Sequence, residues 1–244
     1  MRNEYLTINK LNEIDNLIHA FTTRTCISVG DILKNQFGLN SDKVFTVKQV
    51  HGDNICIINS SLRGTHPVDG SHHSLLPIEA DAIITNIKNL PIGVFTADCL
   101  PIVLADIRGR VVGIIHAGRV GTSLEITKKT VGKIKENFGI SAEEIIAAIG
   151  PGIGGCCYEV DEKSINPFKD RLEYFEKIAI EKYNGRWMLN LIGVNKIQLM
   201  ESGLKSENIF TAEFCTSCHN DKFFSYRREG KTAGRMVSFV AIKG

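Results

Sequence analysis

Three side chains that could hold a metal ion or attack an electrophile stand beside short apolar runs. They are His51, Cys99 and His116, separated by 48 and 17 residues along the chain. A zinc ion that does chemistry usually has three protein ligands drawn from His, Cys and carboxylates, with a fourth position open. The separations match no local metal-binding motif, so the residues permit a His–Cys–His site without showing that they converge. The alternative is that Cys99 is a small buried hydrophobic residue and His116 a hydrogen-bonded turn residue.

The stretch from Ala80 to Thr122 must position two of these residues. It contains three β-branched apolar runs bounded by Gly, Pro or Asp, at 92–96, 102–105 and 111–115. Such runs predict strands that are buried on both faces. Cys99 lies in the break between the first two runs, and His116 follows the third. Rigid strands hold reactive side chains still, which is why α/β proteins place chemistry at strand ends.

The rest of the chain predicts further elements around that stretch. Residues 44–50 alternate and lead through a turn at 51–54 into 55–58, which predicts a strand–turn–strand unit with His51 at its tip. Thr122 to Glu125 has the form of a capping box, which opens a helix that runs to about Phe138. Further strands are predicted at 17–21, 145–149 and 209–212, helices at 31–39, 161–175 and 191–202, and a closing hairpin from 223–228 and 236–242.

Length and composition favour an ordinary globular protein. The 244 residues show no internal repeat or low-complexity linker, so we expect a single domain over 1–244, of the α/β (α+β) class with a mixed β-sheet and flanking helices. The net charge of +2 is too balanced to imply a nucleic-acid partner. No apolar run approaches the roughly 20 residues of a membrane span. The first residues lack a signal core, so we expect a cytoplasmic protein whose seven cysteines are thiols or metal ligands.

The remaining cysteines allow several interpretations. Cys215-x-x-Cys218-His219 has the c-type haem attachment pattern, which requires an exported chain that nothing here indicates. As half of a structural zinc site the pair would need a partner pair. Cys156 and Cys157 are adjacent, which is poor geometry for a chelate. A packed pair of thiols is therefore the favoured interpretation.

Other polar segments carry weaker signals. The glycines of 150–155 could form an anion-binding nest, but the segment lacks the ending of a P-loop and a tight turn is favoured. Arg227 and Arg228 suit either an anion or an internal carboxylate. The polar stretch 59–79 offers nothing to rigidify its histidines as ligands, so a metal role is not favoured for His66, His72 and His73.

Six segments, in order from about residue 44 to the C-terminus, resemble the YfiH family. This family was long labelled multicopper polyphenol oxidase or laccase and later recognised as zinc-containing purine nucleoside phosphorylases. The segments are Lys48-Gln-Val-His-Gly52, Ala80-Asp-Ala-Ile-Ile-Thr85, Thr96-Ala-Asp-Cys-Leu-Pro101, His116-Ala-Gly118, Gly150-Pro151 with Cys156-Cys-Tyr-Glu159, and Cys215-Thr-Ser-Cys218 with Phe223-Phe-Ser-Tyr-Arg-Arg228.

The resemblance implies a YfiH-like fold and a catalytic zinc ion held by His51, Cys99 and His116. It also implies phosphorolysis of adenosine, inosine, guanosine and methylthioadenosine, and hydrolytic deamination of adenosine. The expected partners are therefore a purine nucleoside and phosphate, with the oligomeric state left open. Asp98, beside Cys99, could orient a ligand or transfer a proton, or could simply form a turn.

The chain departs from the family pattern in three places. The usual His-Ala-Gly-Trp-Arg-Gly reads His116-Ala-Gly-Arg-Val-Gly121, and Gly-Pro-Cys-Ile-Gly reads Gly150-Pro-Gly-Ile-Gly154. The glycine- and asparagine-rich stretch after Phe21 is shortened, and with it goes the counterpart of a pocket arginine. We expect the zinc ligands to survive these changes, whereas recognition of phosphate and base is put in question.

Two other functions compete with the zinc enzyme. Cys99 could be the nucleophile of a hydrolase that edits peptidoglycan precursors, with His116 as its base. The chain could also bind nucleosides without turning them over, if the pocket arginines are lost. A copper oxidase is disfavoured, because three nitrogen and sulfur ligands cannot build a multicopper cluster.

Overall fold

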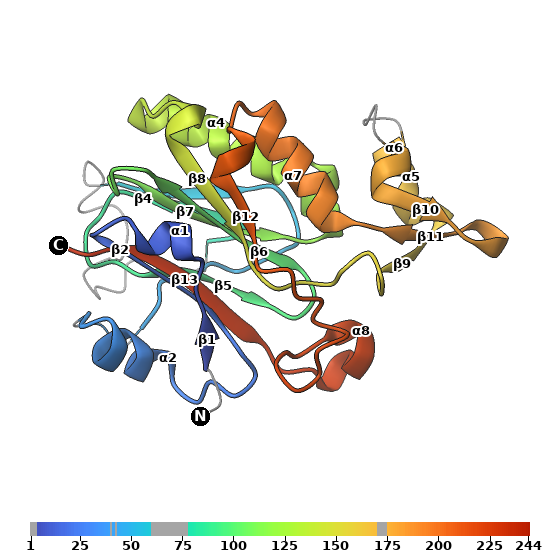
Figure 1. Cartoon of the computed structure of the whole chain (residues 1–244), viewed down its shortest axis with the longest axis horizontal. Coiled ribbons are helices and arrows are strands. Elements are labelled where there is room, and N and C mark those ends of the chain that lie inside the picture. The colour runs from blue at the N-terminus through green and yellow to red at the C-terminus, as the bar shows by residue number, and fades with distance from the viewer. Residues whose placement is uncertain (1–3, 40, 42, 60–77, 170–174) are drawn as a thin grey trace.

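A six-stranded mixed sheet forms the centre of the computed structural model (Figure 1). The structure describes residues 4–39, 41, 43–59, 78–169 and 175–244. The two outer pairs of this sheet, β12 with β8 and β3 with β4, are parallel, and the inner pairs are antiparallel. Its strands, in spatial order, are β12 (Ile209–Thr211), β8 (Ile145–Ile149), β6 (Leu100–Asp106), β7 (Val112–Ala117), β4 (Ala82–Thr85) and β3 (Ile55–Ile58).

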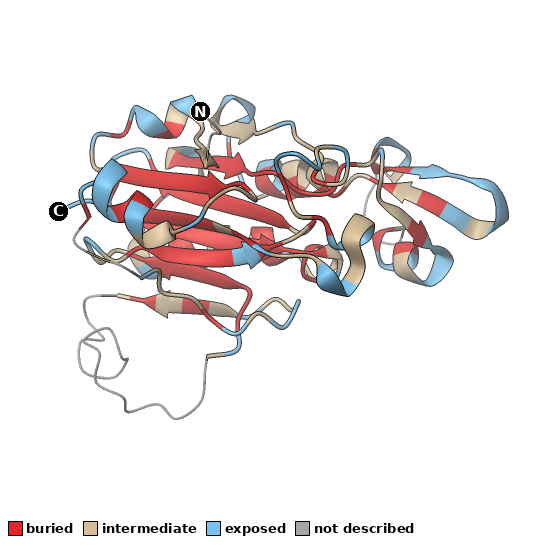
Figure 2. Cartoon of the chain, turned by 90° about the horizontal axis from the view of Figure 1, so that it is seen from below, coloured by how far each residue is buried: buried red, intermediate tan, exposed pale blue. Residues whose placement is uncertain are grey.

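The central strands are apolar throughout because both faces of the sheet are covered. In β6, Ile102 and Leu104 pack into one core with residues of α4 (Ile126–Phe138) and α7 (Leu191–Glu201). Their neighbours Val103 and Ala105 pack into a second core on the opposite face. Side chains alternate across a strand, so a strand between two cores must be apolar at every position. Figure 2 shows these strands buried along their length.

A four-stranded antiparallel sheet supplies the second core. Its order is β1 (Tyr5–Leu6), β2 (Leu17–Thr22), β13 (Met236–Ile242) and β5 (Ile92–Thr96). The far face of this sheet forms a third core with α2 (Val29–Asp31) and the π-helical turn η1 (Ile32–Gln36). The layers are therefore helices, six-stranded sheet, four-stranded sheet and an N-terminal helical segment (Figure 1).

A small three-stranded antiparallel sheet extends from one end of these layers, beside α5 and α6 (Figure 1). Its order is β10 (Ala179–Glu181), β11 (Arg186–Leu189) and β9 (Glu159–Asp161), with α5 at Glu162–Lys169 and α6 at Phe175–Ile178. The remaining short elements are α1 (Asn9–Asn12), α3 (Arg119–Ser123), η3 (Ala142–Glu144), η4 (Tyr183–Gly185), η5 (Ser206–Asn208), α8 (Tyr226–Glu229) and η6 (Gly230–Thr232). None of the helices among the described residues is long and apolar enough to cross a membrane.

Most of the predicted buried strands are confirmed. The runs at 17–21, 92–96, 102–105, 111–115, 145–149 and 209–212 all lie in strands, within one or two residues of the expected bounds. The helix that ends at Phe138 and the helix at 191–202 are also present. Gly139 ends the first of these helices with φ of +67°, a conformation that glycine adopts without strain.

Three local predictions are wrong because tertiary contacts override the local pattern. Residues 44–50 form only isolated bridges, from Phe45 to Ile92 and from Lys48 to Glu79, and β3 pairs with β4 instead. The closing hairpin is absent, since β13 pairs with β2 and β5 while 226–229 forms α8. The capping box also fails, because Thr122 lies inside α3.

Candidate metal centre and its cavity

The three predicted ligands converge. The donor atoms of His51, Cys99 and His116 all lie within 4.8 Å of one another. Cys99 directly precedes β6, and His116 lies in β7 opposite Pro101, so strand pairing brings the two together. His51 reaches them from the loop before β3, where its φ is +61°.

A buried carboxylate, Asp81, positions both histidines. One oxygen accepts hydrogen bonds from Nδ1 of His116 at 2.8 Å and from the backbone N–H of His51 at 3.0 Å. The other accepts from the backbone N–H groups of Val50 at 3.2 Å and Gly52 at 2.7 Å. Asp81 therefore holds the His51 loop and leaves Nε2 of His116 to face Cys99. Asp81 lies in one of the six family segments, but a lone aspartate before a strand gives no sequence signal of this role.

The electrostatics of the site favour a thiolate beside the histidines. Burial disfavours the charged form of Cys99, but hydrogen bonds and charges from His116 and His51 outweigh it and lower the Cys99 pKa to about 6. Burial likewise opposes charge on His116, yet its bonds to Asp81 and Cys99 raise the His116 pKa to about 9. Burial would raise the pKa of Asp81, but the hydrogen bonds from His116 and the loop lower it.

These residues fit a divalent metal ion. A thiolate and two imidazoles are the donors that zinc prefers, and they are drawn from rigid strands and a fixed loop. A Cβ atom at Gly118 would lie 2.9 Å from Sγ of Cys99 and 3.5 Å from Cδ2 of His51. Glycine at this position therefore leaves the donors room to close around an ion. The three residues form a candidate metal-binding group.

The three donors face a cavity of about 790 Å³. This volume is within the range of small-molecule sites. Its walls combine aromatic rings, which suit a planar ring system, with arginines, which suit an anion. The residues that line it are Val47, Gln49, His51, Phe95, Ala97, Asp98, Cys99, His116, Ile153, Tyr158, Tyr226, Arg227 and Arg235.

Asp98 lines this cavity, but its carboxylate is already engaged. One oxygen accepts the hydroxyl of Thr216 at 2.6 Å, and the other accepts the backbone N–H of Arg227 at 2.6 Å. Its φ is +91°, so it also makes the turn that presents Cys99. The geometry assigns it a positioning role between β5 and β6, and a part in proton transfer stays a prediction.

Arg227 and Arg228 are neighbours in the chain but have different roles. The guanidinium of Arg227 lies 5.2 Å from the ring of Tyr158, donates to the carbonyl of Glu159 and lines the cavity. That of Arg228 donates to the backbone carbonyls of Thr216, Ser217 and Phe223 and to Glu229, a structural role.

Three N–H groups of the glycine-rich segment are already hydrogen-bonded within the protein, which favours a packed turn over an anion nest. The N–H groups of Gly150, Ile153 and Gly154 donate to Pro101, Asp98 and Cys215, which leaves them unavailable to a phosphate.

Five further residues line the cavity although the sequence assigned them no role there. Gln49, Tyr158 and Tyr226 lie within the family segments, whereas no motif marks Phe95 or Arg235. Burial raises the pKa of Tyr158, and the charge and hydrogen bond of Arg119 oppose that rise. The arginine of the altered His116-Ala-Gly-Arg segment therefore still reaches a residue of the cavity wall. His66, His72 and His73 lie outside the described residues.

Comparison with known proteins finds relatives of this chain. A purine nucleoside phosphorylase from Clostridium acetobutylicum is 39% identical over 170 residues, which cover 68% of each chain. The adenosine deaminase RL5 from an unknown prokaryotic organism is 29% identical over 244 residues, 99% of this chain and 89% of that protein. The crystal structure of YfiH from Bacillus licheniformis matches with a TM-score of 0.83 at 28% identity, covering 99% of this chain and 97% of that one.

A family model described as multi-copper polyphenol oxidoreductase laccase matches residues 28–243. That range holds all three donors, Asp81 and every residue that lines the cavity. The resemblance drawn from the six segments is thus confirmed, as is the mixed α/β fold. The chain belongs to this laccase-like family, the YfiH family, whose curated members include enzymes named purine nucleoside phosphorylase and adenosine deaminase.

Proposed function

We propose that this protein is a zinc-dependent enzyme that phosphorolyses purine nucleosides and deaminates adenosine. The observation that carries the proposal is the placement of His51, Cys99 and His116 at a cavity walled by aromatic rings and arginines. The names of the relatives supply the substrate class, since they include both purine nucleoside phosphorylase and adenosine deaminase. The expected substrates are adenosine, inosine, guanosine and methylthioadenosine.

The walls of the cavity offer a place for each substrate part. Phe95, Tyr158 and Tyr226 present rings against which a purine can stack. Arg227 and Arg235 bring positive charge for phosphate, and the bond from Arg227 to Glu159 limits how far its guanidinium can move. Zinc held by His51, Cys99 and His116 supplies a Lewis acid at this point of the cavity.

The chemistry asked of the remaining residues is mainly positioning. In phosphorolysis a phosphate oxygen bonds to the ribose C1 carbon while the bond to the base breaks, giving a free base and ribose 1-phosphate. The arginines would orient the phosphate for that attack, and buried dipoles would stabilise charge on the departing base. In deamination, water replaces the amino group of adenosine and yields inosine and ammonia. Asp98 would act indirectly, by holding Arg227 and the Cys99 turn in place.

One observation favours a second candidate, a cysteine hydrolase. Asp81, His116 and Cys99 form a hydrogen-bonded series in which the carboxylate orients the imidazole and the imidazole faces a thiol of lowered pKa. This is the arrangement of nucleophile, base and orienting acid in cysteine hydrolases. Iodoacetamide separates the candidates, because a zinc-bound thiolate is protected and a free nucleophile is alkylated with loss of activity.

The family description names copper, and two imidazoles with a thiolate are also the donors of a blue-copper site. Such sites add a weak axial ligand, usually methionine and sometimes glutamine. No methionine lines this cavity, and both polar atoms of the Gln49 amide are hydrogen-bonded to the backbone of Phe95. The cavity beside the donors also suits a substrate better than electron transfer. Zinc is therefore the metal that we propose.

The test is turnover by protein of known metal content. Purified protein should convert adenosine and phosphate to adenine and ribose 1-phosphate, and adenosine alone to inosine, as resolved by chromatography. Cys99→Ser and His116→Ala should abolish both reactions, whereas Cys56→Ser, a buried cysteine outside the cavity, should not. Zinc-loaded protein that binds these nucleosides without converting any of them would refute the enzyme and leave a binding protein.

A further inference from the structure

A second group of metal-binding side chains lies outside the three-donor centre. The sulfurs of Cys156, Cys157, Cys215 and Cys218 all lie within 4.8 Å of one another. Two loops about sixty residues apart in the chain supply two cysteines each. The pair Cys215 and Cys218 thus meets the partner pair that a four-thiolate site requires.

Local turns allow adjacent cysteines to contribute to one cluster. The N–H groups of Cys157 and Tyr158 both donate to the carbonyl of Gly154 at 3.0 Å, which curls the chain tightly through the pair. The second loop is fixed by a bridge between Gly152 and Cys215 and by the N–H of Thr216, which donates to Gly152 at 2.9 Å. This backbone register, and not local spacing, overcomes the poor chelate geometry expected of neighbouring cysteines.

The spacing of the sulfurs suits a tetrahedral ion. Zinc–sulfur bonds of about 2.3 Å place the sulfurs of a tetrahedron about 3.8 Å apart. Sγ of Cys218 lies 3.7 Å from that of Cys156 and 3.4 Å from that of Cys157. All four residues are free thiols. Because Sγ of Cys218 is in contact with the sulfurs of both Cys156 and Cys157, the geometry favours no single disulfide pair.

The surroundings also suit a thiolate-bound ion. The N–H of Gly154 donates to Sγ of Cys215 at 3.2 Å, and such bonds stabilise a metal-bound thiolate. The guanidinium of Arg228 is held on the carbonyls of Thr216 and Ser217, between the two cysteines of that loop, where its charge offsets a four-thiolate centre. Cys156 and Cys218 are exposed, which gives an ion a path of entry.

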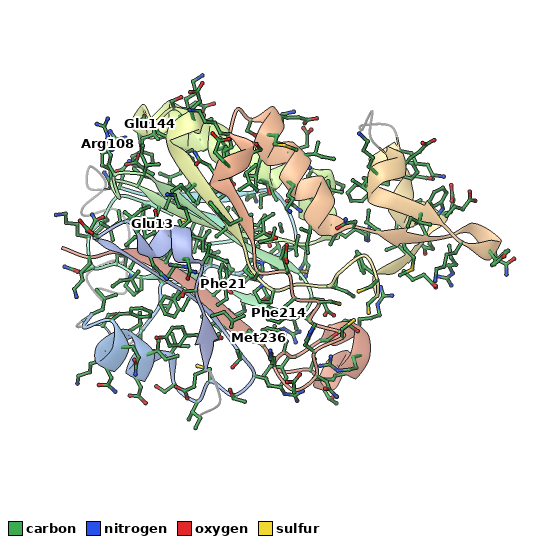
Figure 3. The ribbon with its side chains drawn as sticks, in the orientation of Figure 1. Glu13, Phe21, Arg108, Glu144, Phe214 and Met236 are labelled. Carbon is green, nitrogen blue, oxygen red and sulfur yellow. The ribbon has the colours of Figure 1, made fainter. Side chains whose placement is uncertain are left out.

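We propose that Cys156, Cys157, Cys215 and Cys218 bind a second divalent ion, zinc, that fastens these two loops together as a structural site. The loops also build the catalytic cavity. Ile153 and Tyr158 of the first loop line it, and Thr216 of the second holds the carboxylate of Asp98 beside Cys99. Phe214 (labelled in Figure 3) anchors the second loop, with its ring 5.7 Å from that of Phe223. The ion would therefore fix one wall of the cavity without touching substrate.

Metal stoichiometry tests the proposal independently of the nucleoside chemistry. Zinc-saturated, desalted protein should hold two ions per chain by plasma mass spectrometry. Cys218→Ser and His116→Ala should each hold one, and the double variant none. Cys26→Ser, a partly exposed cysteine outside both clusters, should hold two. A Cys218→Ser protein with the same zinc content as the wild type would overturn the proposal.

Two measurements keep the test decisive if Cys218→Ser folds poorly. Cobalt-substituted His116→Ala protein should show the charge-transfer and visible bands of a tetrahedral four-thiolate centre. In wild-type protein, N-ethylmaleimide should alkylate Cys26 at the same rate with and without a chelator, and the four clustered cysteines only after the chelator removes the metal. Absence of the bands, equal alkylation of all five thiols, or disulfides among the four in non-reducing peptide mapping would each contradict the proposal.

Discussion

Replacing Asp81 by asparagine should weaken metal binding although the three metal-binding residues themselves are unchanged. One oxygen of Asp81 accepts from His116 and the His51 backbone, and the other from Val50 and Gly52. An amide has only one accepting oxygen. If that oxygen serves the loop, the amide NH₂ faces Nδ1 of His116, whose proton must then move to Nε2. That nitrogen would lose the lone pair with which it can bind metal.

The expected losses of zinc affinity and of folding stability follow from the two roles of the Asp81 carboxylate. Loss of a partner that orients a metal-binding histidine typically costs about 10–100-fold in affinity, which is about 1.4–2.7 kcal/mol. Each donor left without an acceptor costs about 1–3 kcal/mol of folding stability. Asp81→Asn should therefore bind zinc at least about tenfold more weakly, and its free energy of unfolding should fall even without metal.

Asp106→Asn is the matched control for this experiment. Asp106 is also a buried aspartate, and it accepts hydrogen bonds from Arg110 at 2.6 and 2.8 Å. Arg110 lies 3.7 Å from Glu144, which Figure 3 shows next to Arg108. None of these residues lines the cavity. Zinc affinity is measured by competition with a chromophoric chelator, and stability by guanidinium unfolding. If both variants lose stability but Asp81→Asn keeps wild-type zinc affinity, the positioning argument is refuted.

Two further changes test the site and the fold. Gly118→Ala places a methyl group 2.9 Å from Sγ of Cys99 and should cost about 1–3 kcal/mol of stability together with zinc affinity. Gly132→Ala, with nothing within 4 Å of its added methyl, should bind zinc as the wild type does, and equal affinities in both variants would contradict the steric argument. Burial lowers the pKa of His19 from 6.5 to about 4, so below pH 6.5 the unfolded state takes up a proton that the folded state refuses. The free energy of unfolding should therefore decrease as the pH is lowered, and His19 should account for about 2 kcal/mol of that decrease between pH 7 and pH 5. His19→Gln keeps an acceptor for the N–H of Ile8 and should lose that part of the slope in guanidinium unfolding; an unchanged slope would rule out His19 as its source.

The sequence by itself determined the buried strands and the ends at which Cys99 and His116 lie. Alternate residues of β6 pack into two different cores, so its residues 102–105 are all apolar. A continuous apolar run of this kind predicts a buried strand without a structure. The sequence predicted the starts of helices and the turns less accurately. Thr122 has the form of a cap and lies inside α3, because packing decided where the helix begins.

Only the tertiary structure decided which distant residues meet. His51 joins Cys99 and His116 because Asp81 holds its loop against β7, a contact between residues 30 apart that no periodicity records. Cys156 and Cys157 meet Cys215 and Cys218 through the bridge between Gly152 and Cys215. The local spacing of apolar side chains is enough to predict which strands are buried. Which distant residues come together depends instead on strand order and loop register, and these are properties of the whole packed chain.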